Sequence, residues 1–229
     1  LVQFGVNGGV GAGTEEGELP AASGNGYAQF VTTLKNLYGT VEISDKAVRA
    51  SENSAGAFVN LLNAEMEGLV RASSFNFGRM LFGDGTGKLA TVSAASGAAL
   101  TVDSARNFAV GMTVDVLTSA GAAVEGGTGL RVTAVDPDAK TVTLSADISA
   151  KLSFADSATY TLSVQGSYGL ELTGLGAIFG DSETLYGLTR SENKWLEPYK
   201  KAVDGAISET AIQTAIDRLE ERAGSRVNF

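Results

Sequence analysis

Five consecutive residues, Gly83-Asp84-Gly85-Thr86-Gly87, have a glycine spacing that can cradle a phosphate with backbone amides. A P-loop or a dinucleotide-binding turn, however, follows a strand and precedes a helix, and the P-loop carries a GK[ST] sequence. Here the preceding residues follow a helical pattern, and GK[ST] is absent. Three glycines in five residues release the backbone from helical dihedrals. We therefore predict that these residues end a helix and do not bind phosphate.

Pairs of carboxylates are the next candidates for chemistry. Asp136 and Asp138 have the spacing of two calcium ligands, but alanine and lysine follow them and no bidentate glutamate completes the loop. A turn is the better prediction for this segment. Glu65 and Glu67 lie two residues apart in a predicted helix, where side chains point in different directions. They are not expected to act as a pair.

The groups that most enzymes use are missing from this chain. It contains no His and no Cys, which removes the commonest general base, the commonest zinc ligand, thiol catalysis and disulfides. A serine nucleophile would then need a lysine as its general base, and no spacing of Ser and Lys in the sequence indicates such a pair. We predict that the protein is not an enzyme and needs no cofactor or metal. The lack of Cys also fits synthesis in a reducing cytosol.

The charge of the chain limits its partners. A net charge of −9 argues against direct binding of nucleic acid, which requires a basic surface. An acidic wall remains compatible with a container that encloses DNA without holding it. No run of 18 apolar residues occurs, so we expect no membrane-spanning helix.

A long helix leads into the glycine-rich turn. Apolar residues recur at spacings of three and four from about Ser54 to Phe82, and no proline interrupts them. Asn53 or Ser54 can cap its first turn. Such a helix would be roughly 40 Å long and is expected to act as a strut. Its stripe comprises Phe58, Leu61, Leu62, Met66, Leu69, Val70, Phe77, Met80 and Leu81.

The glycine-rich N-terminal segment, residues 1–26, leaves two alternatives open. It is a flexible linker, or it is the outgoing strand and tip of a long hairpin that becomes ordered against a neighbouring subunit. In the hairpin, Glu15, Glu16 and Glu18 would lie near the tip and could meet a basic patch on the neighbour. Tyr27 to Ile43 is rich in β-branched and aromatic residues and is predicted to be the returning strand. A short helical turn is expected to follow, capped by Ser44.

Residues 88–165 have a different pattern, with short β-like runs separated by glycine-rich turns. Strands at this spacing predict a small β-barrel or sandwich, inserted after the long helix. The expected strands are Leu89–Ser93, Ala99–Val102, Met112–Leu117, Leu130–Val135, Thr141–Leu144 and Thr159–Val164.

Helical periodicity returns in residues 166–229. A short helix is expected around Leu175, followed by an irregular aromatic loop. Ser208 and Glu209 begin a second clear helix, which should end at Gly224 and pack on the long helix. Its apolar line is Ile207, Ile212, Ile216 and Leu219.

A long helix that ends in GDGTG and follows an extended, glycine-rich hairpin resembles the major capsid protein of tailed bacteriophages, which has the Hong Kong 97-type fold. Residues 3–44 resemble its E-loop hairpin, and 45–82 resemble the short helix and the spine helix of its P-domain. Residues 170–229 resemble the return into the P-domain and the approach to the A-domain. Compared with the family, most of the N-terminal arm and nearly all of the A-domain are missing, so we expect the chain to be the central part of a longer product.

The resemblance implies an α+β fold with four parts. These are the E-loop hairpin (1–44), the P-domain with its spine (45–87), the inserted all-β domain (88–165) and the P-domain return with the start of the A-domain (166–229). Some relatives join subunits covalently through an E-loop lysine. Lys35 is the only lysine of the hairpin here, but its position is not at the tip.

The function implied by the resemblance is structural. The protein would self-assemble as hexamers and pentamers into an icosahedral virion shell around double-stranded DNA, after synthesis in the bacterial cytoplasm. Portal, scaffold or decoration proteins are possible partners. Two alternatives stay open: an encapsulin-type compartment without DNA, and a carbohydrate- or receptor-binding module centred on residues 88–165.

Overall fold

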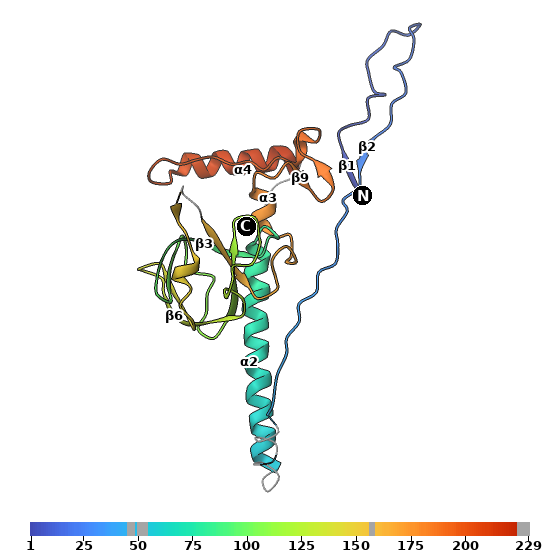
Figure 1. The fold of residues 1–229 in the computed structure, drawn as a ribbon. Helices are drawn as coiled ribbons and strands as arrows, with labels where there is room; N and C mark the ends of the chain where they lie inside the picture. The colour runs from blue at the N-terminus through green and yellow to red at the C-terminus, as the bar shows by residue number, and fades with distance from the viewer. Residues whose placement is uncertain (45–48, 50–54, 156–158, 224–229) are drawn as a thin grey trace. The chain divides into compact units, whose positions relative to one another are not determined.

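The computed structural model describes residues 1–44, 49, 55–155 and 159–223. They belong to two compact units, Leu34–Ala177 and Leu1–Thr33 with Ile178–Phe229. The fold is α+β, with helices and mostly antiparallel strands (Figure 1). The short helical turn expected after Ser44, the caps at Asn53 and Ser54, and the helix end at Gly224 fall outside the described residues.

The main helix of the first unit is α2, Ala55–Phe82, which confirms the predicted long helix. Its 28 residues span about 42 Å at 1.5 Å per residue. Met80 is buried, and Leu62 and Leu69 are partly buried. The rest of the described apolar stripe is exposed: Met66, Val70, Phe77 and Leu81, together with Phe75 and Phe82 nearby. The helix therefore offers more apolar surface than its own unit covers.

Six antiparallel strands follow α2 and close into a barrel beside it (Figure 1). Their order is β3-β4-β7-β6-β5-β8, and β3 pairs with both β4 and β8, so no strand is left as an open edge. All six strands lie where the sequence predicts them, with ends that differ by a few residues. They are β3 Lys88–Ser96, β4 Ala99–Val102, β5 Thr113–Thr118, β6 Leu130–Asp136, β7 Thr141–Leu144 and β8 Tyr160–Val164.

The barrel has a core of its own. Its buried cluster is aliphatic apart from Phe108, and all of its members lie between Leu89 and Leu162. One buried polar residue, Asp115, accepts hydrogen bonds of 2.8 Å from the backbone amides of Gly129 and Gly166. This carboxylate joins two turns of the barrel to β5, and its burial is compensated by these bonds. The residues that are completely excluded from solvent are Val92, Leu100, Val114, Val116, Val132, Val142, Leu162 and Ser163.

We expect residues 88–165, expressed alone, to fold as an all-β unit, because closure and core both lie within this range. A segment of this size buries just enough surface to be stable by itself. Circular dichroism should show β structure and a cooperative thermal transition. A spectrum of unfolded chain would mean that the barrel depends on α2.

The second unit begins with a hairpin whose paired strands are short. Strand β1, Val2–Phe4, pairs with β2, Gly26–Ala28, and the register joins Val2 to Ala28. The predicted returning strand from Tyr27 to Ile43 is wrong beyond Ala28, since residues 29–44 have no regular secondary structure. The reason is the lack of a ladder partner: β propensity does not form a strand where the backbone has no neighbouring strand to bond. The amide of Val31 instead donates to the carbonyl of Tyr186 at 2.9 Å.

An aromatic cluster holds the base of this hairpin. The ring of Phe4 stacks on Trp195 with centroids 5.5 Å apart, and Phe30 lies 5.9 Å from the same ring. Phe30 also lies 5.7 Å from Tyr186, in the turn between β9 (Thr184–Leu185) and β10 (Leu188–Thr189). Trp195 itself belongs to the 3-10 helix η3, Lys194–Leu196. The hairpin base is thus fixed by packing, while the loop beyond it has little to pack against.

Two polar contacts order the segment after the short helix α3, Leu175–Phe179. The buried guanidinium of Arg190 donates to the carbonyls of Ile178 and Gly180, both at 2.9 Å, at the end of that helix. The hydroxyl of Ser191 donates to Glu183 and lowers the pKa of that carboxyl. The contact is therefore complete at neutral pH and is lost as the pH falls through the lowered value.

The last helix, α4, spans Glu209–Ala223 and begins where the sequence predicts. The backbone amide of Ala211 donates to the Ser208 hydroxyl at 3.2 Å, which is the contact of an N-cap. The predicted packing of this helix on α2 stays a prediction.

Amide exchange should distinguish the base of the hairpin from its loop. We expect residues 5–26 of the isolated chain to exchange rapidly, because the backbone hydrogen bond from Gly17 to Thr14 closes only one turn there and the side chains are exposed. In an assembled particle the same amides should be protected. Strong protection in a monodisperse monomer would contradict this expectation.

Candidate functional site

The GDGTG segment joins α2 to strand β3, and its conformation matches the predicted helix-ending turn. The carboxylate of Asp84 accepts hydrogen bonds from the Thr86 amide at 2.9 Å and from the Thr86 hydroxyl at 2.6 Å. Gly85 and Gly87 have φ of +91° and +77°, in the left-handed region that favours glycine. The turn is therefore stabilised by its own side chain and by two glycines.

Gly85→Val should lower the free energy of unfolding by about 1 kcal/mol or more, since a β-branched residue is strained at this positive φ. The added Cβ would also lie 3.3 Å from the hydroxyl of Thr173. Thermal or denaturant unfolding measures the loss. Gly24→Val is the matched control, because Gly24 has an ordinary φ and open space around it. Equal stability of the two variants would contradict the account of the turn.

A buried ion pair ties the end of α2 to the chain that returns from the barrel. The guanidinium of Arg79 donates to both carboxylate oxygens of Glu171, at 2.8 and 2.6 Å, and to Asn76 at 3.2 Å. The side chains of the pair are only 6% and 3% exposed. Such a bidentate pair gives a geometrically specific link. Sequence reasoning missed both residues, which lie 92 positions apart and carry no motif.

Two further glycines allow the returning chain to cross the end of α2 at close range. A Cβ on Gly174 would lie 2.4 Å from the Leu81 carbonyl oxygen, and one on Gly176 would lie 2.8 Å from the carbonyl carbon of Gly83. The amide of Gly174 donates to the Gly83 carbonyl at 3.1 Å. Only glycine fits these two positions without a backbone shift. The end of α2, the GDGTG turn and residues 171–176 thus form one rigid junction.

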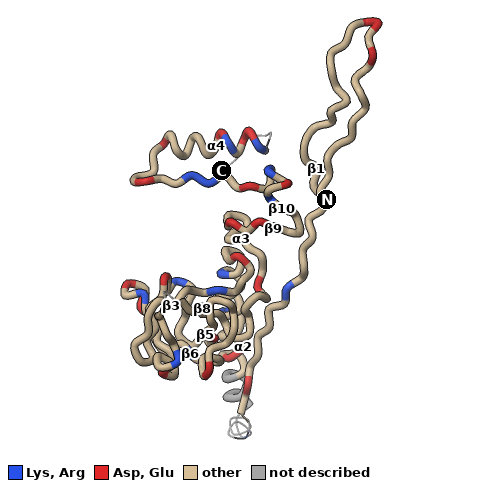
Figure 2. The backbone as a smooth tube through the Cα atoms, turned by 45° about the horizontal axis from the view of Figure 1, so that its top comes forward, with Lys and Arg blue, Asp and Glu red and all other residues tan. Residues whose placement is uncertain are grey.

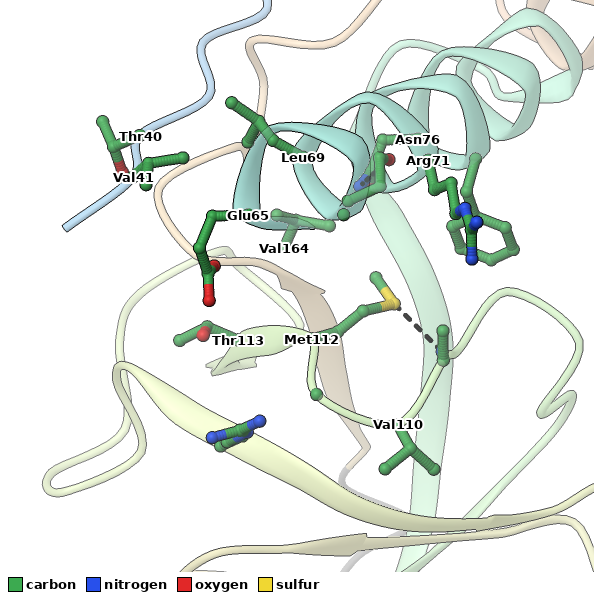
Figure 3. A pocket seen from close by; sticks show the side chains of 16 residues that line it. Thr40, Val41, Glu65, Leu69, Arg71, Asn76, Val110, Met112, Thr113 and Val164 are labelled. Carbon is green, nitrogen blue, oxygen red and sulfur yellow. Dashed lines mark hydrogen bonds between the residues drawn. The ribbon is translucent and has the colours of Figure 1, made fainter. Parts of the chain in front are cut away.

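A groove of about 810 Å³ runs between the middle of α2, the barrel and residues 40–41 (Figure 3). Arg71 on α2 and Arg131 on β6 line it, and both are exposed. Neither forms an ion pair within the part of the chain that the structure describes. Glu65 also lines the groove, whereas Glu67 lines a different surface hollow. The two glutamates therefore point apart, as the helical spacing predicts.

The acidic residues of the hairpin lie at its far end. The amide of Gly17 donates to the Thr14 carbonyl at 3.1 Å, so Glu15 and Glu16 occupy the centre of the tip turn and Glu18 follows it. Figure 2 shows this acidic tip. Their predicted place near the tip is confirmed. Lys35 lies elsewhere, with its Nζ 3.4 Å from the Gly169 carbonyl oxygen.

The remaining candidates for chemistry have structural explanations. Asp136 accepts hydrogen bonds from the amides of Asp138 and Ala139, at 3.0 and 2.9 Å, which confirms the predicted turn. Within the described residues, no three acidic or other ligating side chains gather as a metal would require. Over the same residues, every helix is too short or too polar to cross a membrane.

Comparison of the chain with known protein families, curated proteins and solved structures gives no match.

Proposed function

We propose that this protein is a structural subunit that assembles with copies of itself into a closed shell, the icosahedral head of a tailed bacteriophage with the Hong Kong 97-type fold. In this proposal the hairpin is the E-loop, α2 is the spine helix of the P-domain, and the barrel is an inserted domain. The shell is built from hexamers and pentamers and forms the virion capsid.

The observation that carries the proposal is the exposed apolar side of α2. Phe77 is 49% exposed, Val70 61% and Leu81 45%, and the three lie within about 40° of one another around the helix. Large apolar side chains gathered in this way mark a surface that another protein covers. In a shell made of one kind of subunit, neighbouring copies provide that cover. Several weak contacts on each subunit then suffice, because each reinforces the others.

The acidic hairpin tip gives the shell a specific contact. We assign Glu15, Glu16 and Glu18 to the groove of a neighbouring copy, where Arg71 and Arg131 have no carboxylate partner among the described residues. The positive charges of Arg71 and Arg131 outweigh the negative charge of Glu65, so the groove keeps a net positive charge that attracts the tip. Such complementarity determines which surfaces meet and in what register.

The net charge of −9 bears on how the shell would interact with the DNA that it encloses. An acidic subunit encloses double-stranded DNA without binding its sequence. An encapsulin-type compartment, with cargo protein in place of DNA, has the same subunit contacts. Nuclease treatment of purified particles distinguishes the two: a phage head protects DNA of a defined length, and a compartment retains protein cargo only.

A carbohydrate- or receptor-binding module is the weaker alternative. Such a module needs exposed aromatic rings, and the barrel segment has three aromatic residues. Phe108 is buried in its core, while Phe154 and Tyr160 pack edge to face at 5.4 Å against the same core. The aromatic rings of the barrel are thus used for its own packing.

A further inference from the structure

The N-terminal hairpin contains the same dipeptide twice, as Asn7-Gly8 and Asn25-Gly26. Asparagine followed by glycine can cyclise, because the glycine nitrogen reaches the side-chain carbon Cγ and no Cβ on the glycine hinders the approach. Both asparagines are exposed. Their backbones differ: Asn7-Gly8 lies in a stretch without regular secondary structure, whereas Gly26 is the first residue of β2. The hairpin thus places one reactive dipeptide in two different environments.

At the first pair the backbone forms an Asx turn. The amide of Gly9 donates to Oδ1 of Asn7 at 2.8 Å. Attack of a nitrogen on Cγ would place negative charge on this same oxygen in the tetrahedral intermediate. A backbone N–H about 2.7–3.1 Å from the oxygen that gains charge stabilises such an intermediate, as in an oxyanion hole. The turn therefore favours cyclisation at Asn7.

The second pair is held in a way that opposes cyclisation. Nδ2 of Asn25 donates to the hydroxyl of Tyr27 at 3.4 Å, so this contact involves the nitrogen that would leave and not the oxygen that would gain charge. Gly26 pairs with Phe4 in the β1-β2 ladder, and a Cβ on Gly26 would lie 2.8 Å from the Phe4 carbonyl oxygen. A backbone paired in this way must open before it can rotate into the cyclic form.

We propose that Asn7 is a site of spontaneous deamidation, and that the β1-β2 pairing protects Asn25 from the same reaction. The nitrogen of Gly8 bonds to Cγ of Asn7 and loses its proton, the Cγ–Nδ2 bond breaks, and Nδ2 leaves with that proton as ammonia. Water then opens the cyclic imide at either carbonyl, which gives aspartate or isoaspartate. Each event adds a negative charge to a hairpin whose tip is already acidic (Figure 2). The reaction needs neither partner nor assembly, so it is independent of the proposed function.

The test incubates the whole purified chain at mildly alkaline pH and follows each asparagine by mass spectrometry. Cleavage at the glutamates between the two pairs places Asn7 and Asn25 in separate peptides. We expect Asn7 to be converted to the acid several-fold faster than Asn25. Asn36, which is exposed and followed by leucine, is the control and should stay largely intact.

The same measurement in denaturant separates the fold from the local sequence. Once the turn and the ladder are lost, the two Asn-Gly pairs should be converted at similar rates. Equal rates in the folded chain would overturn the proposal. An undiminished preference for Asn7 in denaturant would overturn it as well, because the structure would then not be the cause.

Gly9→Pro tests the turn directly, since proline has no N–H to donate to Oδ1 of Asn7. Deamidation of Asn7 in the folded variant should be several-fold slower than in the natural chain. Gly11→Pro, which leaves the Gly9 amide in place, is the matched control and should not change the rate. An unchanged rate in Gly9→Pro would overturn the role assigned to the turn.

Discussion

Glu171→Ala should lower the free energy of unfolding by about 3–5 kcal/mol, because it leaves the charge of Arg79 buried without its partner. The expected loss is large since both side chains are almost fully enclosed at the rigid junction. Chemical denaturation followed by circular dichroism measures it. The control is Glu125→Ala, which removes an exposed ion pair with Lys151 and should cost no more than about 1 kcal/mol.

A double substitution separates the charge from the packing. Arg79→Met combined with Glu171→Met removes both charges together, and it should recover most of the stability that Glu171→Ala loses. A double variant as unstable as Glu171→Ala would mean that the bidentate hydrogen bonds between Arg79 and Glu171 stabilise the junction, and that burying an unpaired charge is not the cause of the loss. A small effect of Glu171→Ala alone would contradict the described burial.

Reversal of the acidic tip should prevent assembly without unfolding the subunit. The variant with Glu15→Lys, Glu16→Lys and Glu18→Lys carries three positive charges at the tip. These charges repel the arginines in the groove of a neighbouring copy, and like charges placed together cost several kcal/mol. The assembled fraction, measured by light scattering, should fall more than tenfold. The melting temperature should not change, because the tip is exposed.

Restoring the opposite charge should restore assembly. Arg71→Glu and Arg131→Glu, added to the reversed tip, should return particles, whereas the same two changes in the natural background should impair them. The matched control places three lysines at other exposed acidic positions, Asp138, Glu192 and Asp204, and should assemble normally. Failure of the rescue would show that the tip meets a different surface.

The sequence predicted those features that depend on neighbouring residues. The three- and four-residue spacing in α2, the Ser208 cap of α4 and the turns between barrel strands are all local signals. The hairpin alternative for residues 1–26 also predicts Glu15, Glu16 and Glu18 near the tip, where the chain turns.

The features it did not predict depend on distant parts of the chain. Arg79 meets Glu171 only because the barrel brings the chain back to the end of α2, and no periodicity encodes such a return. Gly174 and Gly176 have no sequence signal that distinguishes them from other loop glycines. They are needed because a Cβ at either position would clash with the backbone at the end of α2. The strand expected from Tyr27 to Ile43 failed for the related reason that a strand needs a partner.

The most direct test of the proposed function is negative-stain electron microscopy of the complete gene product after expression in bacteria. The proposal predicts closed, icosahedral shells of uniform size, and their loss when Glu15, Glu16 and Glu18 are replaced by lysine. Monodisperse monomers or small oligomers, under conditions where the natural protein is folded and concentrated, would contradict it.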